Sequence, residues 1–186
     1  MKRVMIVGGP GSGKSTLAGQ LGEVTGLPVF HMDKIHYLPG WIEREKAAKA
    51  EMTRQIHALD QWIFEGGHSA TYPERTTRAD HFIWLDVPVW TRIYRVLYRT
   101  YKYYGQVRPD LQDECPERFN WQTLDFLWFI IRTRHSSRQK LLNIYQNPPR
   151  HLQVFRLTTQ ADIDAFMTGV RSGKVDQSAE QLQKTT

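Results

Sequence analysis

The sequence predicts an α/β protein of three layers, in which a five-stranded parallel sheet is covered by helices on both faces. Compact runs of β-branched and aromatic residues alternate along the chain with longer segments whose apolar residues recur at helical spacing. This alternation is typical of parallel strands that are connected by helices. The 186 residues suit one domain, and the 40% of hydrophobic residues suffice for a buried core.

The first strand is expected at residues 4–7, an apolar run of the kind that is buried on both faces of a sheet. A glycine-rich segment follows, and from Lys14 onward the positions of Leu17, Leu21 and Val24 recur at helical spacing. Gly26 and Pro28 end this helix, because glycine suits the left-handed residue after a helix and proline cannot continue one.

The remaining elements follow in alternation. Four further strands are expected at residues 28–32, 62–64, 81–87 and 152–157. Helices are expected at residues 43–59, 69–79, 89–104, 121–144 and 161–170, the first of them solvated. Pro73 is compatible with the helix at 69–79 only in its first turn. The polar residues 171–186 are expected to form a tail.

Composition limits the partners and the compartment. The 25 Lys and Arg against 19 Asp and Glu give a net charge of +6, which favours nucleotides, phosphate esters, nucleic acid or an acidic membrane face. Cys115 is the single cysteine, so no intramolecular disulfide forms and a cytoplasmic location is expected. The longest apolar run, residues 126–131, is far below the ~18 residues that a membrane span needs.

The strongest motif lies between the first strand and the first helix and reads Gly8-Gly9-Pro10-Gly11-Ser12-Gly13-Lys14-Ser15. It matches G-x-x-x-x-G-K-[ST], whose small residues let backbone N–H groups surround a polyphosphate at a helix N-terminus. We expect Lys14 to bridge the β- and γ-phosphates of ATP, Ser15 to coordinate Mg²⁺, and Thr16 to reach the α-phosphate. A strand before the motif and a helix after it distinguish such a P-loop from a connecting turn.

Later segments carry a resemblance. These are His31-Met32-Asp33-Lys34, Trp62-Ile63-Phe64-Glu65-Gly66, Leu85-Asp86-Val87-Pro88 and Cys115-Pro116-Glu117-Arg118-Phe119. In this order, over about residues 3–168, the chain resembles the adenylate-kinase-like small P-loop kinases, and more narrowly the group labelled DNA topology modulation proteins. The resemblance implies a P-loop NTPase fold in a single domain over residues 1–170, with an acceptor-binding region at about 33–60 and a small helical lid at about 100–121.

Carboxylates are expected where strands end, next to the phosphate loop. We expect Glu65 to hold Mg²⁺, at a place where the resemblance implies an aspartate. Asp33 is a second candidate metal ligand and is expected to orient an acceptor hydroxyl and take its proton, although helix capping is an alternative. For Asp86, a capping or structural bond and a metal contact are equally open.

Arginines are expected where negative charge develops during phosphoryl transfer. Arg95 and Arg99 lie one turn apart on the helix at 89–104, and the resemblance implies that Arg99 contacts ATP. Arg108 falls within the lid, and Arg138 follows on the next helix, so Arg99, Arg108 and Arg138 are the candidate catalytic arginines. The alternative is a solvated basic face that pairs with nearby carboxylates.

Tyrosines are interleaved with these arginines, at positions 94, 98, 101, 103 and 104. They could stack on bases, but their helical spacing favours packing in the core and lid. Residues 121–131 are likewise expected to form a buried helix face. The histidines show no metal-ligand spacing, and Cys115 is expected to pack rather than to react.

These observations predict an ATP-dependent kinase that moves the γ-phosphoryl group of ATP·Mg²⁺ to a small acceptor, a nucleoside, a nucleotide or another small alcohol. The adenine is expected against the loop after the last strand, near Thr158. The alternatives are a nucleotide-dependent nucleic-acid-binding protein and a regulatory ATPase with little turnover. No membrane partner is expected.

Overall fold

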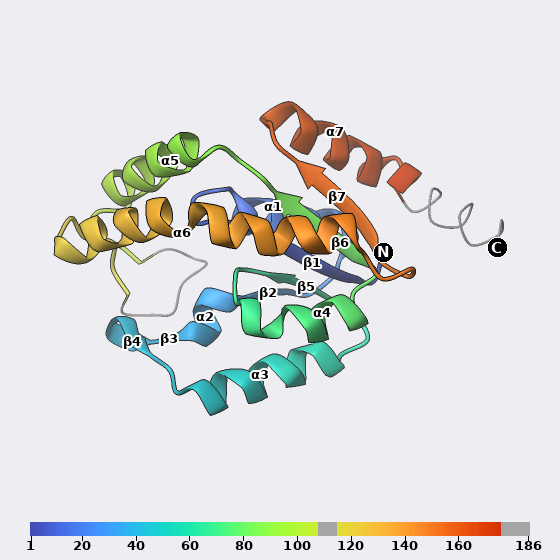
Figure 1. Ribbon diagram of the computed structural model, residues 1–186, viewed down its shortest axis with the longest axis horizontal. Helices are drawn as coiled ribbons and strands as arrows, with labels where there is room; N and C mark the ends of the chain where they lie inside the picture. The colour runs from blue at the N-terminus through green and yellow to red at the C-terminus, as the bar shows by residue number, and fades with distance from the viewer. Residues whose placement is uncertain (108–114, 176–186) are drawn as a thin grey trace.

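The computed structural model describes residues 1–107 and 115–175. Its sheet has five parallel strands in the order β2-β5-β1-β6-β7 (Figure 1). These are β1 (Arg3–Gly8), β2 (Val29–His31), β5 (Trp62–Glu65), β6 (His81–Leu85) and β7 (Gln153–Leu157). The predicted α/β class and all five predicted strands are confirmed. Because β1 is central, the glycine-rich segment leaves the sheet between the carboxyl ends of β5 and β6.

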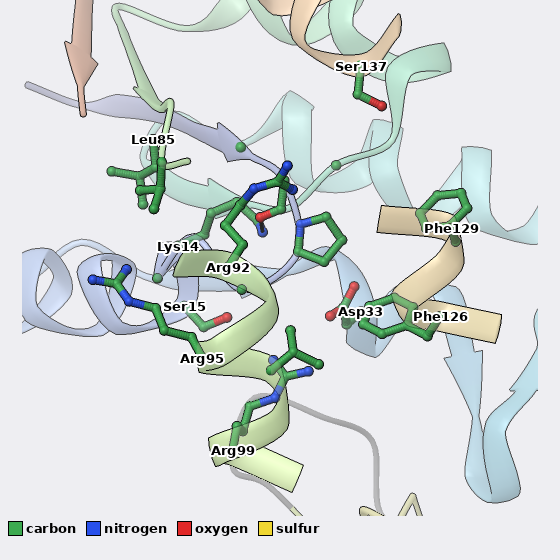
Figure 2. A pocket seen from close by; sticks show the side chains of 18 of the residues that line it. Lys14, Ser15, Asp33, Leu85, Arg92, Arg95, Arg99, Phe126, Phe129 and Ser137 are labelled. Carbon is green, nitrogen blue, oxygen red and sulfur yellow. Dashed lines mark hydrogen bonds between the residues drawn. The ribbon is translucent and has the colours of Figure 1, made fainter. Parts of the chain in front are cut away.

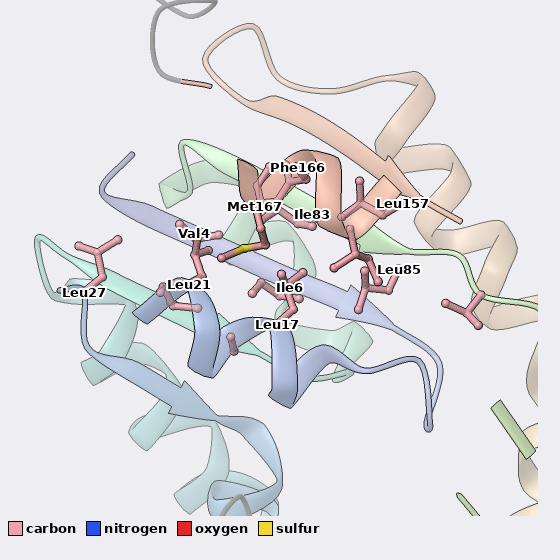
Figure 3. Packing of buried hydrophobic residues seen from close by; sticks show 14 residues of the cluster. Val4, Ile6, Leu17, Leu21, Leu27, Ile83, Leu85, Leu157, Phe166 and Met167 are labelled. Carbon is pink, nitrogen blue, oxygen red and sulfur yellow. The ribbon is translucent and has the colours of Figure 1, made fainter. Parts of the chain in front are cut away.

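Helices cover both faces of this sheet (Figure 1). One face is packed against α1 (Lys14–Thr25) and α7 (Gln160–Arg171), and the other against α3 (Lys46–Ala58), α4 (Tyr72–Arg78) and α6 (Trp121–Gln146). Successive residues of β1 serve the two cores alternately: Val4 and Ile6 join Leu17, Leu21 and Phe166 (Figure 3), whereas Met5 and Val7 join the opposite cluster. Each such side chain contributes about 1.5–3 kcal/mol by leaving water.

The region after β2 is built differently from the prediction. The strand ends at His31, and Met32–His36 forms a short helix, α2. A small hairpin follows, made of β3 (Tyr37–Leu38), the 3-10 turn η1 (Pro39–Trp41) and β4 (Ile42–Glu43). Asp33 therefore lies in the first turn of α2 and does not close a strand. These elements are too short to have a hydrophobic period that could be seen in the sequence.

Two helices begin where local chemistry allows. Pro73 falls in the first turn of α4, as the sequence requires, and residues Ser69–Thr71 before it form the 3-10 turn η2. The helix α3 is less solvated than expected, because Lys49, Thr53 and His57 are buried on its inner face. No helix in the described part of the chain is long and apolar enough to cross a membrane.

The predictions for two aromatic segments were wrong. On α5 (Val89–Lys102) and just after it, the tyrosines at 94, 98, 101 and 104 are more than half exposed, and so is Trp90. In the stretch 121–131 of α6, Trp121, Leu124, Trp128 and Phe129 are exposed and Ile130 is buried. Helical spacing predicts that apolar residues share a face, but it does not determine whether another element covers that face.

Part of the predicted lid lies outside the residues that the structure describes. Residues 108–114, which include Arg108, and residues 176–186 of the tail are not among the described residues. On either side of the first gap, isolated bridges join Tyr104 to Glu117 and Val107 to Pro116. The end of α5 and the start of α6 are therefore held together at one end of the molecule.

Candidate active site

The glycine-rich loop between β1 and α1 has the backbone that an anion site needs. Gly8, Gly11 and Gly13 have φ values of 152°, 77° and 99°, which favour glycine. A Cβ on Gly8 would lie 2.6 Å from the Leu85 carbonyl oxygen, so this position also has no room for a side chain. Gly13 caps α1 without a side-chain hydrogen bond, and the first turn holds no acidic residue. The N–H groups at this helix end therefore lack side-chain acceptors and suit a phosphate.

Lys14 and Ser15 project from the start of α1 toward the cleft (Figure 2). The Lys14 ammonium donates to the Gly9 carbonyl oxygen at 3.2 Å, and the Ser15 hydroxyl donates to Glu65 Oε1 at 3.0 Å. Ser12 Oγ is buried and has no hydrogen-bond partner within the described residues. Thr16 lies exposed on the first turn and also lines the cleft. The predicted donor-site residues 8–16 are thus together at one place.

Glu65 brings a third strand end into the site. Its side chain is buried, and Oε1 also lies 2.8 Å from Nδ1 of His31. A hydroxyl and a carboxylate next to a phosphate loop fit Mg²⁺, which takes oxygen ligands and keeps several waters. Within residues 1–107 and 115–175 no group of three or more His, Cys, Asp or Glu side chains is placed so that it could hold a metal ion.

Sequence reasoning did not single out His31. The signal that could have found it is the register of β2 against β5, in which His31 is the direct partner of Glu65. Neighbouring residues in parallel strands point to the same side, so the partner of a candidate ligand is itself a candidate. That register becomes predictable only when the strand order is known.

Asp33 reaches the same cleft from the opposite wall. It is exposed on α2, and Figure 2 shows it across the cleft from the α5 arginines. His36, Tyr37 and Trp41 continue this wall. We refer to residues 32–43 as the acceptor wall. The cleft between the walls has a volume of about 1970 Å³.

Three arginines enter the cleft from α5 (Figure 2). Arg95 Nη1 donates to the Ser12 carbonyl oxygen at 3.2 Å, and Arg99 Nε lies 3.5 Å from Glu117 Oε1. Arg99 thus pairs with a nearby carboxylate, as the alternative to a catalytic role expected. Arg92, which was not predicted as a site residue, is buried against Gly9.

Arg138 and Asp86 are bound to one another. Arg138 Nε and Nη2 donate to Asp86 at 3.0 and 2.9 Å, and Arg156 Nη2 donates to the same carboxylate at 2.7 Å. Asp86 does not cap α5, whose N-cap is Pro88. Of the alternatives for Asp86, the structural bond is the one present. Arg138 lines the cleft, but this forked contact directs its guanidinium to Asp86.

Thr158 lies at the cleft with its polar groups in use. Its N–H and hydroxyl donate to Asp162 Oδ2 at 2.7 and 2.8 Å, in a capping arrangement at the start of α7 that also includes Thr159. These hydrogen bonds lower the pKa of Asp162 to about 2. The contact of Thr158 with adenine stays a prediction.

The acceptor wall is tied to the far side of the predicted lid. Trp41 Nε1 donates to the Pro116 carbonyl oxygen at 3.2 Å, and the Trp41 N–H lies 3.4 Å from Cys115 Sγ. Cys115 is buried and also contacts the Leu38 carbonyl oxygen at 3.5 Å, in line with its expected packing role. We call these contacts the Trp41 clasp. Trp41 and Pro116 also line the cleft.

Solved structures share this fold over nearly the whole chain. A shikimate kinase from Acinetobacter baumannii in complex with shikimate aligns with a TM-score of 0.54 at 15% identity, covering 95% of this chain and 94% of that one. A gluconokinase from Sinorhizobium meliloti 1021 gives 0.54 at 14%, covering 100% and 97%. A shikimate kinase from Bacteroides thetaiotaomicron gives 0.52 at 19%, covering 92% and 96%.

These likenesses define the class of fold. The chain shares the α/β fold of these solved kinase structures, and its own sheet has five parallel strands with helices on both faces. No family model matches the sequence, and no curated protein sequence matches it. The comparisons support no particular subgroup, so the likeness to DNA topology modulation proteins stays a prediction.

Proposed function

We propose that this protein is an ATP-dependent kinase that transfers the γ-phosphoryl group to a hydroxyl group of a small molecule. The observation that carries the proposal is the convergence of the phosphate loop, the Ser15–Glu65 pair and Asp33 on one cleft. Phosphoryl transfer needs this combination, because it depends on positioning and on stabilising negative charge more than on covalent chemistry by the protein.

On the donor side, the loop amides and the start of α1 would hold the phosphates. Lys14 would exchange its bond to the Gly9 carbonyl for phosphate oxygens, since a charged acceptor is the stronger partner. Ser15 and Glu65 would hold Mg²⁺, which when bound neutralises charge on the phosphates. The α5 arginines would add positive charge from the other side.

On the acceptor side, Asp33 would orient the hydroxyl and accept its proton as the new bond forms. The wall around it combines hydroxyl, imidazole and indole groups, which suits a small polar molecule with an apolar face. A shikimate kinase and a gluconokinase share this fold, which supports a small hydroxylated acceptor. Nucleosides and nucleotides belong to the same chemical class of acceptor.

The test is a panel of small alcohols, sugar acids, nucleosides and nucleotides, assayed for ATP consumption with product mass measured. A true acceptor raises ATP consumption and yields a product heavier by one phosphoryl group. Lys14→Ala should lower turnover by about 100-fold to 1000-fold, the usual cost of removing a donor to developing charge. Lys46→Ala, an exposed lysine on α3 outside the cleft, serves as the matched control and should leave turnover unchanged. A wild-type protein that binds no ATP would contradict the proposal.

One observation favours a second candidate function. The exposed tyrosines of α5, with the Tyr94 and Tyr98 rings stacked at 6.3 Å, offer a surface on which bases could stack next to the basic cleft. A nucleotide-dependent nucleic-acid-binding protein would use them in this way. It would bind single-stranded DNA or RNA with a steep salt dependence, and Tyr94→Ala with Tyr98→Ala would weaken binding. Salt-independent or absent binding would leave the kinase proposal alone.

A further inference from the structure

Gly9 differs from the other glycines of the phosphate loop. Gly8, Gly11 and Gly13 have positive φ values, but Gly9 is not among the residues in that region. Its backbone therefore does not require glycine. A methyl group at this position would collide with the guanidinium of Arg92, at the end of a flexible side chain. The guanidinium can therefore keep its present place only while position 9 has no side chain.

The Arg92 side chain is buried, and one nitrogen of its guanidinium lacks an acceptor within the described residues. The residue is 8% exposed, and its Nε has no hydrogen-bond partner among residues 1–107 and 115–175. Burial lowers the pKa of Arg92, and the carboxylate of Asp86 acts in the opposite direction. Asp86, however, is already bound by Arg138 and Arg156. A buried cation in such surroundings is costly unless an anion joins it.

Two cations meet at this one glycine. Lys14 donates to the Gly9 carbonyl oxygen at 3.2 Å, and the Arg92 guanidinium lies against the Gly9 Cα on the face where a side chain would be. The other arginines of α5 already have acceptors: Arg95 donates to the Ser12 carbonyl of the same loop, and Arg99 pairs with Glu117. Of the two α5 arginines at the loop, Arg92 is thus the one whose charge is less compensated.

We propose that Arg92 is a phosphate-binding residue of the donor site, which contacts the phosphate chain of the bound nucleotide from its seat over Gly9. This inference rests on the proposed function, because it requires a nucleotide in the loop. The planar guanidinium suits phosphate oxygens, to which it can donate two parallel hydrogen bonds. An arginine supplied in this way from the same chain stabilises charge in phosphoryl transfer. Glycine at position 9 leaves room for this guanidinium next to the loop.

The competing explanation is that Arg92 only fills space between α5 and the loop. The two roles differ in how affinity depends on phosphate. A residue that binds phosphate contributes more affinity with each charged phosphate that it reaches. A packing residue affects the affinities for adenosine and ATP equally. The experiment therefore measures the affinities of adenosine, AMP, ADP and ATP, with Mg²⁺ present, by titration calorimetry.

The variants are Arg92→Met, which keeps a long apolar side chain, and Arg92→Lys, which keeps the charge. We expect Arg92→Met to weaken the binding of ATP about 10-fold to 100-fold, the cost of one charge-assisted hydrogen bond. The affinity for adenosine should not change. Arg92→Lys should lie between Arg92→Met and the wild type, since the ammonium lacks the fork. Arg132→Met, an exposed arginine of α6 outside the cleft, removes the same charge and should leave every affinity unchanged.

A second pair of variants tests the contact from the loop side and does not depend on Arg92→Met being stable. Gly9→Ala should displace the guanidinium and weaken ATP to a similar extent. In an Arg92→Ala background the methyl group finds empty space, so the double variant should be no weaker than Arg92→Ala alone. If the losses of ATP binding free energy in Gly9→Ala and Arg92→Ala add in full in the double variant, the contact is contradicted, because independent sites are additive.

The results separate the two proposals. If the wild type binds no nucleotide, both fail. If the wild type binds ATP and Arg92→Met binds it equally well, or loses adenosine and ATP by the same factor, Arg92 is not a phosphate ligand and the proposed function stands. A loss that grows from adenosine to ATP, with the Gly9→Ala and Arg92→Ala effects overlapping, establishes the contact.

Discussion

The two walls of the cleft are made in different ways. The donor wall is one uninterrupted segment, residues 8–16, attached to the central strand β1, whose residues Val4 to Val7 have no exposed surface. The acceptor wall, residues 32–43, consists of a short helix and a hairpin at the edge of the sheet, and Asp33 on it is exposed. In the proposed function the donor wall would bind through backbone groups and the acceptor wall through side chains. This difference explains why a motif predicts a donor but does not predict an acceptor.

The acceptor wall meets the end of β5 at Gly66, directly after Glu65. A Cβ on Gly66 would collide with Met32, so glycine here lets α2 lie against the end of β5. Arg75, which is fully buried, donates to the Gly66 carbonyl oxygen at 2.9 Å and lies 4.1 Å from the centre of the Phe64 ring. Burial lowers the pKa of Arg75 to about 10, so it remains charged at neutral pH. This junction holds the acceptor wall against the strand that carries Glu65.

The largest effect that separates the walls should come from Asp33. Asp33→Asn keeps the size of the side chain but cannot take a proton, so we expect kcat to fall by at least about 100-fold with the accepted substrate. The affinity for ATP should not change, because Asp33 belongs to the acceptor wall. Single-turnover assays with calorimetry of ATP binding measure both quantities. Asp60→Asn, an exposed aspartate before β5, is the control, and an equal loss of ATP affinity in Asp33→Asn would remove the distinction between the walls.

Much of the fold and of the donor wall was predictable from the sequence. The run Val4 to Val7 and the loop after it are contiguous, so local pattern and local chemistry suffice. The contacts His31–Glu65, Arg92–Gly9 and Arg138–Asp86 were not predictable, because each joins residues that are distant in sequence. They depend on strand order and on where α5 and α6 pack, which no local period determines. The prediction that the tyrosines of α5 are packed was wrong for the same reason, since tertiary structure determines whether another element covers a helix face.

A smaller effect should follow from loosening the Trp41 clasp. Trp41→Phe removes the hydrogen bond from Nε1 to the Pro116 carbonyl and keeps an aromatic ring beside Tyr37, whose centre lies 5.2 Å away. We expect the KM for the acceptor to rise about 2-fold to 10-fold, the cost of one neutral hydrogen bond, while the KM for ATP stays constant. Steady-state kinetics with each substrate varied measures this. A rise in the KM for ATP alone would show that the clasp serves the donor wall.

The smallest effect concerns pH and involves His36 of the acceptor wall and His68, whose ring centre lies 6.5 Å from that of His36. Burial lowers the pKa of His36, and Lys49 adds to the shift while Glu43 and Asp33 oppose it. Burial also lowers the pKa of His68, whose charged neighbours are Lys49, Arg75, His36 and Glu43. Because the folded pKa of each lies below the unfolded value of 6.5, the unfolded chain binds more protons in between. The contribution of these two histidines to the free energy of unfolding is therefore fully present above pH 6.5 and is lost as the pH falls below 6.5.

Thermal unfolding between pH 8 and pH 5 measures this contribution. The variant with both His36→Gln and His68→Gln should lose less stability on acidification than the wild type, by a few degrees in Tm at most, since about 1 kcal/mol moves Tm by about 2–4 °C at this size. The pH dependence of ATP affinity should be the same in both proteins, because neither histidine lies in the donor wall. Equal acid sensitivity of the variant and the wild type would show that these two histidines do not report on the acceptor wall, whatever their burial.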